Sequence, residues 1–132
     1  MKYLLDTPTW IWANSFPELL SPTVVDTLEA LTQEDNLLLS AISLWEVCKL
    51  VEKGRIQIFS DLEEWVRQAL DIPGLQVVPL DFRVFYKSTT LPGAFHRDPA
   101  DQMIVATARL TDAVILTKDQ RIRDYPYVKS IW

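Results

Sequence analysis

The sequence predicts an α/β fold in which helices cover both faces of a mostly parallel sheet of four or five strands. Two observations support this prediction. Short apolar runs recur along the chain, and a helical segment separates each run from the next. Runs that are short and apolar throughout are typical of strands that helices cover on both faces. The chain has 132 residues, 48% of them hydrophobic and 23% charged, which fits one globular domain over residues 1–132.

The predicted strands follow the apolar runs. The first run stops at Asp6, and the second is too short to be a helix. The third follows a Pro73-Gly74 turn, and the last forms an edge of the sheet. The five strands are expected at residues 2–5, 37–40, 75–80, 113–116 and 128–131.

Each predicted helix begins at a residue that can cap it, often with a proline in the first turn, where no N–H is needed. The expected starts are Thr7-Pro8, Ser21-Pro22, Ser43, Ser60, Asp81, Asp98-Pro99 and Asp119. The second helix is expected to run to about Glu34, the third to end at Gly54, and the helix after Pro99 to end near Leu110. Apolar spacing predicts that Val84 and Phe85 point inward, and that Cys48 is a small buried residue of its helix.

Charge and cysteine content narrow the class of protein. The net charge of −5 argues against broad electrostatic capture of nucleic acid. No Lys or Arg occurs between Lys2 and Lys49, so the first half is expected to present an acidic face. A single cysteine excludes an internal disulfide, and no apolar run reaches the ~20 residues that a membrane span needs. The N-terminus lacks the pattern of a signal peptide, so we expect a cytoplasmic protein.

Five carboxylates are predicted to meet at one edge of the sheet. In parallel sheets, ligands bind beyond the carboxyl ends of the strands, and helix starts lie at the same edge. Asp6 and Asp119 follow the first and fourth strands, and Glu46 follows the second by one loop. Asp98 and Asp101 open the helix that leads into the fourth strand.

Each of these acids also has a structural explanation as a helix cap. Asp6, Asp98 and Asp119 stand at helix starts, and Ser43-x-x-Glu46 has the spacing of a capping box. Concentrating like charges at one edge is nevertheless unfavourable unless a cation relieves it. Carboxylates without cysteine or histidine partners favour a hard ion, Mg²⁺ or Mn²⁺. The single His96 is expected to have a surface or loop role, with contact to substrate or proton transfer as the alternative.

Four segments resemble the PIN-domain ribonucleases, and most closely the VapC-type toxins of toxin–antitoxin pairs. The segments are YLLDT at 3–7, SLWEV at 43–47 with Lys49 and Gly54, HRDPAD at 96–101, and LTKD at 116–119. They occur in the expected order over nearly the whole chain. Residues 125–132, at the end of the sequence, also resemble this group. Position 8 departs from it, because relatives often carry His where this chain has Pro8.

The resemblance implies a three-layer α/β/α PIN-like fold and cleavage of RNA by a Mg²⁺- or Mn²⁺-dependent endoribonuclease that leaves a 5′-phosphate and a 3′-hydroxyl. It also implies a cognate antitoxin and a homodimer. By position it implies that Asp6, Glu46, Asp101 and Asp119 are catalytic and metal-binding. Asp98 would be the least certain metal ligand, with Thr117 and Ser43 supporting the site.

Basic residues that flank the acids in sequence are candidates for binding RNA phosphates. They are Arg97, Lys118 and Arg121, with Lys49 and Lys53 weaker because both fit the solvated face of their helix.

Other classes of protein also gather acids beside a parallel sheet. A haloacid-dehalogenase-like phosphatase needs a second Asp two residues after the first, where this chain has Pro8. A receiver domain needs an Asp that accepts phosphate after the third strand, where Asp81 is better explained as a cap. The alternative from another class is a non-catalytic PIN-fold module that acts through partner contact. It would be marked by loss of an acidic position.

Overall fold

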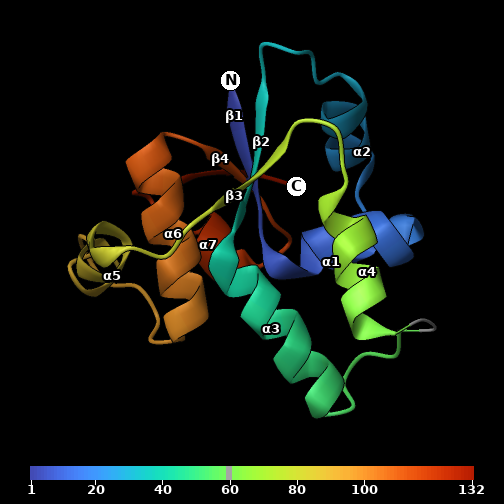
Figure 1. The fold of residues 1–132 in the computed structure, drawn as a ribbon. Helices are drawn as coiled ribbons and strands as arrows, with labels where there is room; N and C mark the ends of the chain where they lie inside the picture. Colours follow the sequence, from blue (N-terminus) through green and yellow to red (C-terminus); the bar gives the residue numbers. More distant parts are fainter. Residues whose placement is uncertain (59–60) are drawn as a thin grey trace.

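The computed structural model, which describes residues 1–58 and 61–132, contains a five-stranded sheet in the order β3-β2-β1-β4-β5 (Figure 1). Every neighbouring pair of strands is parallel. The strands are β1 (Lys2–Leu5), β2 (Asn36–Ser40), β3 (Leu75–Val78), β4 (Val114–Leu116) and β5 (Lys129–Ile131). The predicted fold class is confirmed.

The central strand β1 fixes the position of the site. Leu5, its last residue, pairs with Leu39 on β2 and with Leu116 on β4. Strands β1 and β4 therefore end level with each other and β2 ends one residue further, so the residues that follow the three strands meet at one edge. The backbone N–H of Asp6 donates to the carbonyl of Leu116 at 3.4 Å, which continues the β1–β4 pairing one residue further.

Helices cover both faces of the sheet, as Figure 1 shows. One side carries α1, α2 and α4, and the other carries α6 and α7, with α5 packed on α6. The longer helices are α1 (Thr7–Ser15), α2 (Pro22–Glu29), α3 (Ala41–Glu52), α4 (Leu62–Leu70), α5 (Phe82–Thr89) and α6 (Pro99–Thr111). Two short elements complete the set, the 3-10 helix Pro17–Leu19 and α7 (Gln120–Arg123). No helix among the described residues is long and apolar enough to cross a membrane.

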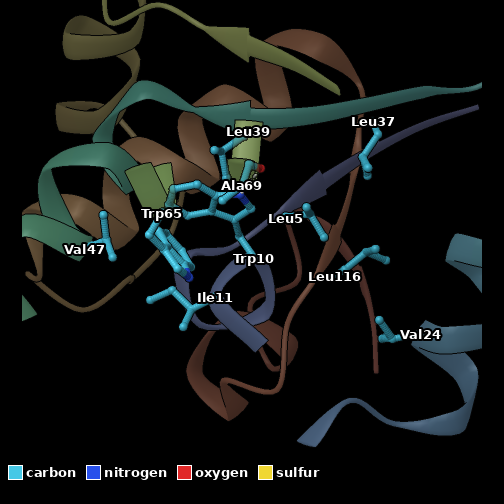
Figure 2. Close-up of a cluster of buried hydrophobic side chains, with 10 residues drawn as sticks. All are labelled: Leu5, Trp10, Ile11, Val24, Leu37, Leu39, Val47, Trp65, Ala69 and Leu116. Carbon is cyan, nitrogen blue, oxygen red and sulfur yellow. Dashed lines mark hydrogen bonds between the residues drawn. The ribbon is translucent and has the colours of Figure 1, made fainter. Parts of the chain in front are cut away.

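Successive strand residues point to opposite faces and form two cores. Leu4 and Ile115 pack against α6, whereas Leu5 and Leu116 pack against the helices of the opposite face. Figure 2 shows the second of these clusters, in which Trp10 of α1 is completely buried. The Trp10 indole N–H donates to the carbonyl of Ala69 at 3.0 Å, and its ring meets that of Trp65 edge-on at 5.1 Å between centroids.

Several predicted boundaries differ from the structure. Helix α2 ends at Glu29, because a turn follows in which the Asp35 carboxylate accepts from the Thr32 N–H at 3.0 Å. Strand β3 ends at Val78, two residues before the predicted Leu80. The predicted cap Ser60 lies outside the described residues, and Asp61 caps α4.

Two predicted buried side chains are exposed. Phe85 is 42% exposed because α5 turns Val84, rather than Phe85, toward α6. Cys48 lies on the solvent side of α3.

Candidate metal centre

Asp6 caps α1 and is almost fully buried, with 4% of its surface exposed. Its carboxylate accepts from the Thr9 N–H at 3.0 Å and from the Thr117 hydroxyl. Burial raises the pKa of Asp6 above its ordinary value, and the nearby charge of Asp119 adds to this, although both hydrogen bonds act to lower it. Asp6 is therefore a buried acid whose charged form needs a further positive partner.

Asp98 and Asp101 occupy the start of α6, as predicted. Asp98 caps the helix and accepts from the N–H groups of Ala100 and Asp101, at 3.0 and 3.4 Å. Asp101 lies in the first turn, where it caps nothing. Burial raises the pKa of Asp101 to about 7, and the charges of Asp98, Asp119 and Glu46 contribute further. A carboxyl group that is half-protonated near neutral pH is typical of functional sites.

Asp119 follows β4 and caps α7 by accepting from the Arg121 N–H at 2.9 Å. The Arg121 guanidinium also lies 3.1 Å from the Asp119 carboxylate and 3.5 Å from that of Asp101. Burial acts to raise the pKa of Asp119, but the hydrogen bonds and charge of Arg121 outweigh it, so the pKa is lowered. Arg121, predicted to bind RNA phosphates, is thus engaged with two of the acids.

Glu46 reaches the same edge from α3. Because Ser40 caps this helix, accepting from the Ile42 N–H at 3.2 Å, the predicted helix start and capping box at Ser43 are wrong. Ser43 instead lies buried inside α3, 2.8 Å from the Thr7 hydroxyl, which donates its proton to Glu46. A hydroxyl has one proton to give, so Ser43 donates to Thr7, and a relay of two hydroxyls holds Glu46. Thr7 was not among the predicted site residues, although it follows Asp6 directly in the first motif.

The acids line two neighbouring pockets. Asp6, Asp101 and Asp119 line a pocket of about 290 Å³ together with Lys118. Glu46 and Asp98 line a larger cleft of about 760 Å³. Burial is the largest cause of the raised pKa of Glu46, and the nearby charges of Asp98 and Asp6 raise it further. The four predicted catalytic acids therefore gather at one edge of the sheet. Three of them line the smaller pocket, whereas Glu46 lines the larger cleft beside it.

His96 lies at this site, whereas the sequence favoured a surface or loop role for it over a part in substrate contact or proton transfer. Its Nδ1 accepts from the Asp98 N–H at 3.3 Å. Nε2 lies 3.2 Å from the Asp101 carboxylate. Three side chains each bring one atom that could bind a metal to within 4.8 Å of the other two; they are His96, Asp101 and Asp119.

The residues present fit a hard divalent cation. Carboxylate oxygens dominate the set, and burial, together with the charges of neighbouring acids, raises the pKa values of Asp6, Glu46 and Asp101, so a bound cation would stabilise their charged forms. Basic side chains stand beside it: Lys118 and Arg97 are both exposed, and Lys118 lines the smaller pocket.

Comparison with known proteins identifies the family of this chain. Residues 3–127 match the PIN domain family. Ribonuclease VapC22 of Mycobacterium tuberculosis is 31% identical over 131 residues, which are 98% of this chain and 97% of that protein.

Solved structures share the fold. VapBC2 from Rickettsia felis has a TM-score of 0.71 at 20% identity and covers 99% of this chain and 98% of its own. A toxin–antitoxin complex from Klebsiella pneumoniae has a TM-score of 0.65 at 22% identity, and the match covers 96% of this chain and 94% of the chain in that complex. The chain therefore belongs to the PIN-domain family, as its four sequence motifs predicted.

Proposed function

We propose that this chain is a divalent-metal-dependent endoribonuclease and the toxin of a toxin–antitoxin pair. One observation carries the proposal. Asp6, Asp101 and Asp119, which follow or precede different strands, line one pocket, and Asp101 there has a pKa of about 7. The name of the relative VapC22 describes a ribonuclease, which supports RNA as the substrate.

The metal is assigned to the acids by position and burial. Asp6 and Asp101 would hold it. Asp119 and Glu46 would complete its ligands directly or through water, and Asp98 would be the least certain ligand. Carboxylate oxygens suit Mg²⁺ and Mn²⁺ alike, and we expect either ion to support activity. When bound, such an ion activates water at neutral pH and offsets the negative charge of a phosphodiester under attack.

The chain's own residues orient the reacting groups. Thr117 fixes Asp6, and the Ser43–Thr7 relay fixes one oxygen of Glu46, which leaves its other oxygen to orient the attacking water. Lys118 and Arg97 would bind the phosphates on either side of the cut, and Arg121 would join them once a metal replaces it at Asp101 and Asp119. In-line attack then gives a 5′-phosphate and a 3′-hydroxyl.

Two protein partners are part of the proposal. Solved relatives are described as VapBC and toxin–antitoxin complexes, so we expect a cognate antitoxin encoded beside this chain, and a cytoplasmic pair. Acidic residues of the first half would face a basic antitoxin segment; they are Glu18, Asp26, Glu29, Glu34 and Asp35. We also expect a homodimer. Phe82 and Tyr86 of α5, 76% and 54% exposed and stacked at 6.0 Å, are apolar surface suited to that contact.

RNA cleavage with defined metal tests the function. Purified protein is incubated with a 5′-labelled single-stranded RNA in Mg²⁺, in Mn²⁺ and in chelator, and the product ends are determined. We expect cleavage with either metal, none in chelator, and 3′-hydroxyl ends. Cleavage that persists in chelator would contradict the metal mechanism. Absence of cleavage with both metals, beside tight antitoxin binding, would favour the non-catalytic PIN-fold module instead.

A further inference from the structure

A large cleft adjoins the acidic site on its α3 side. Its volume is about 760 Å³, and side chains of α3, of α5 and of the start of α6 line it. Glu46 and Asp98 lie in its wall, so the cleft opens directly onto the acidic cluster. Whatever fills this cleft is in contact with the site where we place the metal.

An exposed tryptophan forms part of the wall. Trp45, next to Glu46 on α3, is 57% exposed, although large aromatic side chains dominate protein cores. The ammonium group of Lys49 lies over its ring at 5.9 Å from the centroid. Trp45 therefore exposes an aromatic ring with a cation over one face, and a nucleobase can stack on the part of the ring that Lys49 leaves open.

Basic side chains continue the cleft away from the acids. Lys49 stands three residues after Glu46 on α3, and Lys53, which caps the C-terminal end of that helix, stands seven residues after it. Both lie on the side of the helix that carries Glu46, and Lys53 is roughly 10 Å along the axis. Arg55 follows beyond the helix end. Lys49 pairs with Glu52 at 2.5 Å, whereas Lys53 and Arg55 are exposed and form no ion pair with any residue that the structure describes.

We propose that this cleft is a subsite for the single-stranded RNA next to the cut phosphate. A base stacks on Trp45, and Lys49, Lys53 and Arg55 bind the phosphates that lead away from the metal. The inference rests on the proposed ribonuclease function and adds the path of the substrate. Charge favours RNA over other occupants, because Lys53 and Arg55 bring two cations without an ion-pair partner among the described residues to this cleft, in a chain whose net charge is −5.

The subsite implies a preference for unpaired RNA. A base can stack on Trp45 only when it is free of its own duplex, since bases in A-form RNA are already stacked and paired. Stacking is tolerant of sequence, so Trp45 would select single strands rather than a particular base.

Binding of RNA in a non-cleaving background tests the subsite. Asp6→Asn is the parent protein, with Mg²⁺ present and RNA integrity checked on a gel. A fluorescein-labelled single-stranded 12-mer and its duplex are titrated by anisotropy at several salt concentrations. Trp45→Ala and the double variant Lys53→Gln/Arg55→Gln are compared with Tyr127→Ala, which removes an exposed aromatic side chain outside the cleft. Circular dichroism and solution mass are recorded for each variant.

We expect Trp45→Ala to weaken single-strand binding about tenfold and Tyr127→Ala to leave it unchanged. The double variant should reduce the slope of log affinity against log salt by about 0.7 for each phosphate that it no longer neutralises.

Equal affinity of Trp45→Ala and the parent would overturn the subsite while leaving the ribonuclease proposal intact. A Trp45→Ala protein that loses its dimeric mass would identify the cleft as an interface between copies. If the parent binds no RNA and wild-type protein cleaves none, both proposals fail together.

Discussion

The hydroxyl of Thr117 donates a hydrogen bond to the carboxylate of Asp6, which joins two residues 111 positions apart in the sequence. The contact exists because β1 and β4 are parallel neighbours that end level with each other. Thr117 also accepts from the Asp119 N–H at 3.0 Å. One buried hydroxyl therefore fixes Asp6 and the loop that carries Asp119, so both acids depend on it for their positions.

Replacing Thr117 by Val should disturb both acids without changing the side-chain shape. The variant leaves Asp6 with one hydrogen bond fewer and the Asp119 N–H unpaired, so we expect metal affinity and cleavage to fall about tenfold or more. The free energy of unfolding should fall by roughly 1–3 kcal/mol. Thr117→Ser keeps the hydroxyl and should recover most of the activity. Equal activity of Val and Ser at this position would show that the hydroxyl does not position the acids.

The raised pKa of Asp101 predicts an unusual pH dependence of stability in metal-free protein. Its pKa is about 7 in the folded state against an ordinary value of 3.8, so the folded protein holds this proton more tightly than the unfolded chain. Stability should therefore fall as pH rises from 4 toward 7, then level off. Asp6 and Glu46 act in the same direction. Thermal melts in chelator should show the slope, and Asp101→Asn should reduce it. A flat profile in wild-type protein would contradict the assignment.

The same proton should compete with the metal. Mn²⁺ affinity measured by calorimetry should rise with pH from 4 toward 7, with proton release on binding, because a protonated carboxyl group must lose its proton to bind the ion. Affinity that does not change over this range would show that the raised acids are not the metal ligands.

Trp10 should be essential to the fold. Trp10→Phe removes the hydrogen bond to the Ala69 carbonyl and part of a fully buried ring, so we expect the free energy of unfolding to fall by about 3 kcal/mol. Denaturant unfolding measures this decrease. Trp45→Phe, at a site 57% exposed, is the control and should change it by less than about 0.5 kcal/mol.

Arg97 should act on RNA binding rather than on folding. Arg97→Ala should weaken binding of single-stranded RNA and flatten its salt dependence, because one phosphate is no longer neutralised and its counterion is no longer released. Arg83→Ala removes an exposed arginine on α5 and serves as the matched control. Identical salt slopes for the two variants would remove Arg97 from the binding surface.

The elements and the acidic cluster could be predicted because they are local signals. Short apolar runs ended by Asp6 and by Thr117-Lys118-Asp119 mark strand ends, and parallel topology brings such ends to one edge. The caps at Asp6, Asp98 and Asp119 were predicted as well, and each also lies in the site.

The remaining features depend on packing that no local pattern encodes. Helix α3 begins at Ala41 because Ser40 caps it, which turns Ser43 into a buried partner of Thr7 instead of a cap. His96 faces Asp101 only because the loop before α6 folds back over that helix start. The exposure of Phe85 and Cys48 reflects how α5 and α3 rotate on their neighbours.

The central claim is that the acids at this edge hold a metal that cuts RNA. Asp6→Asn tests it against Asp81→Asn, since both residues cap a helix, accepting from Thr9 and Val84 at 3.0 and 3.1 Å, and asparagine caps as well as aspartate. The measurement is the initial rate of cleavage of single-stranded RNA in Mn²⁺, with melting temperatures recorded in chelator. We predict that Asp6→Asn loses cleavage by a factor of about 100 or more while melting no lower than wild type, and that Asp81→Asn retains full activity. Cleavage by Asp6→Asn at the wild-type rate, in a preparation free of contaminating nuclease, would contradict the account.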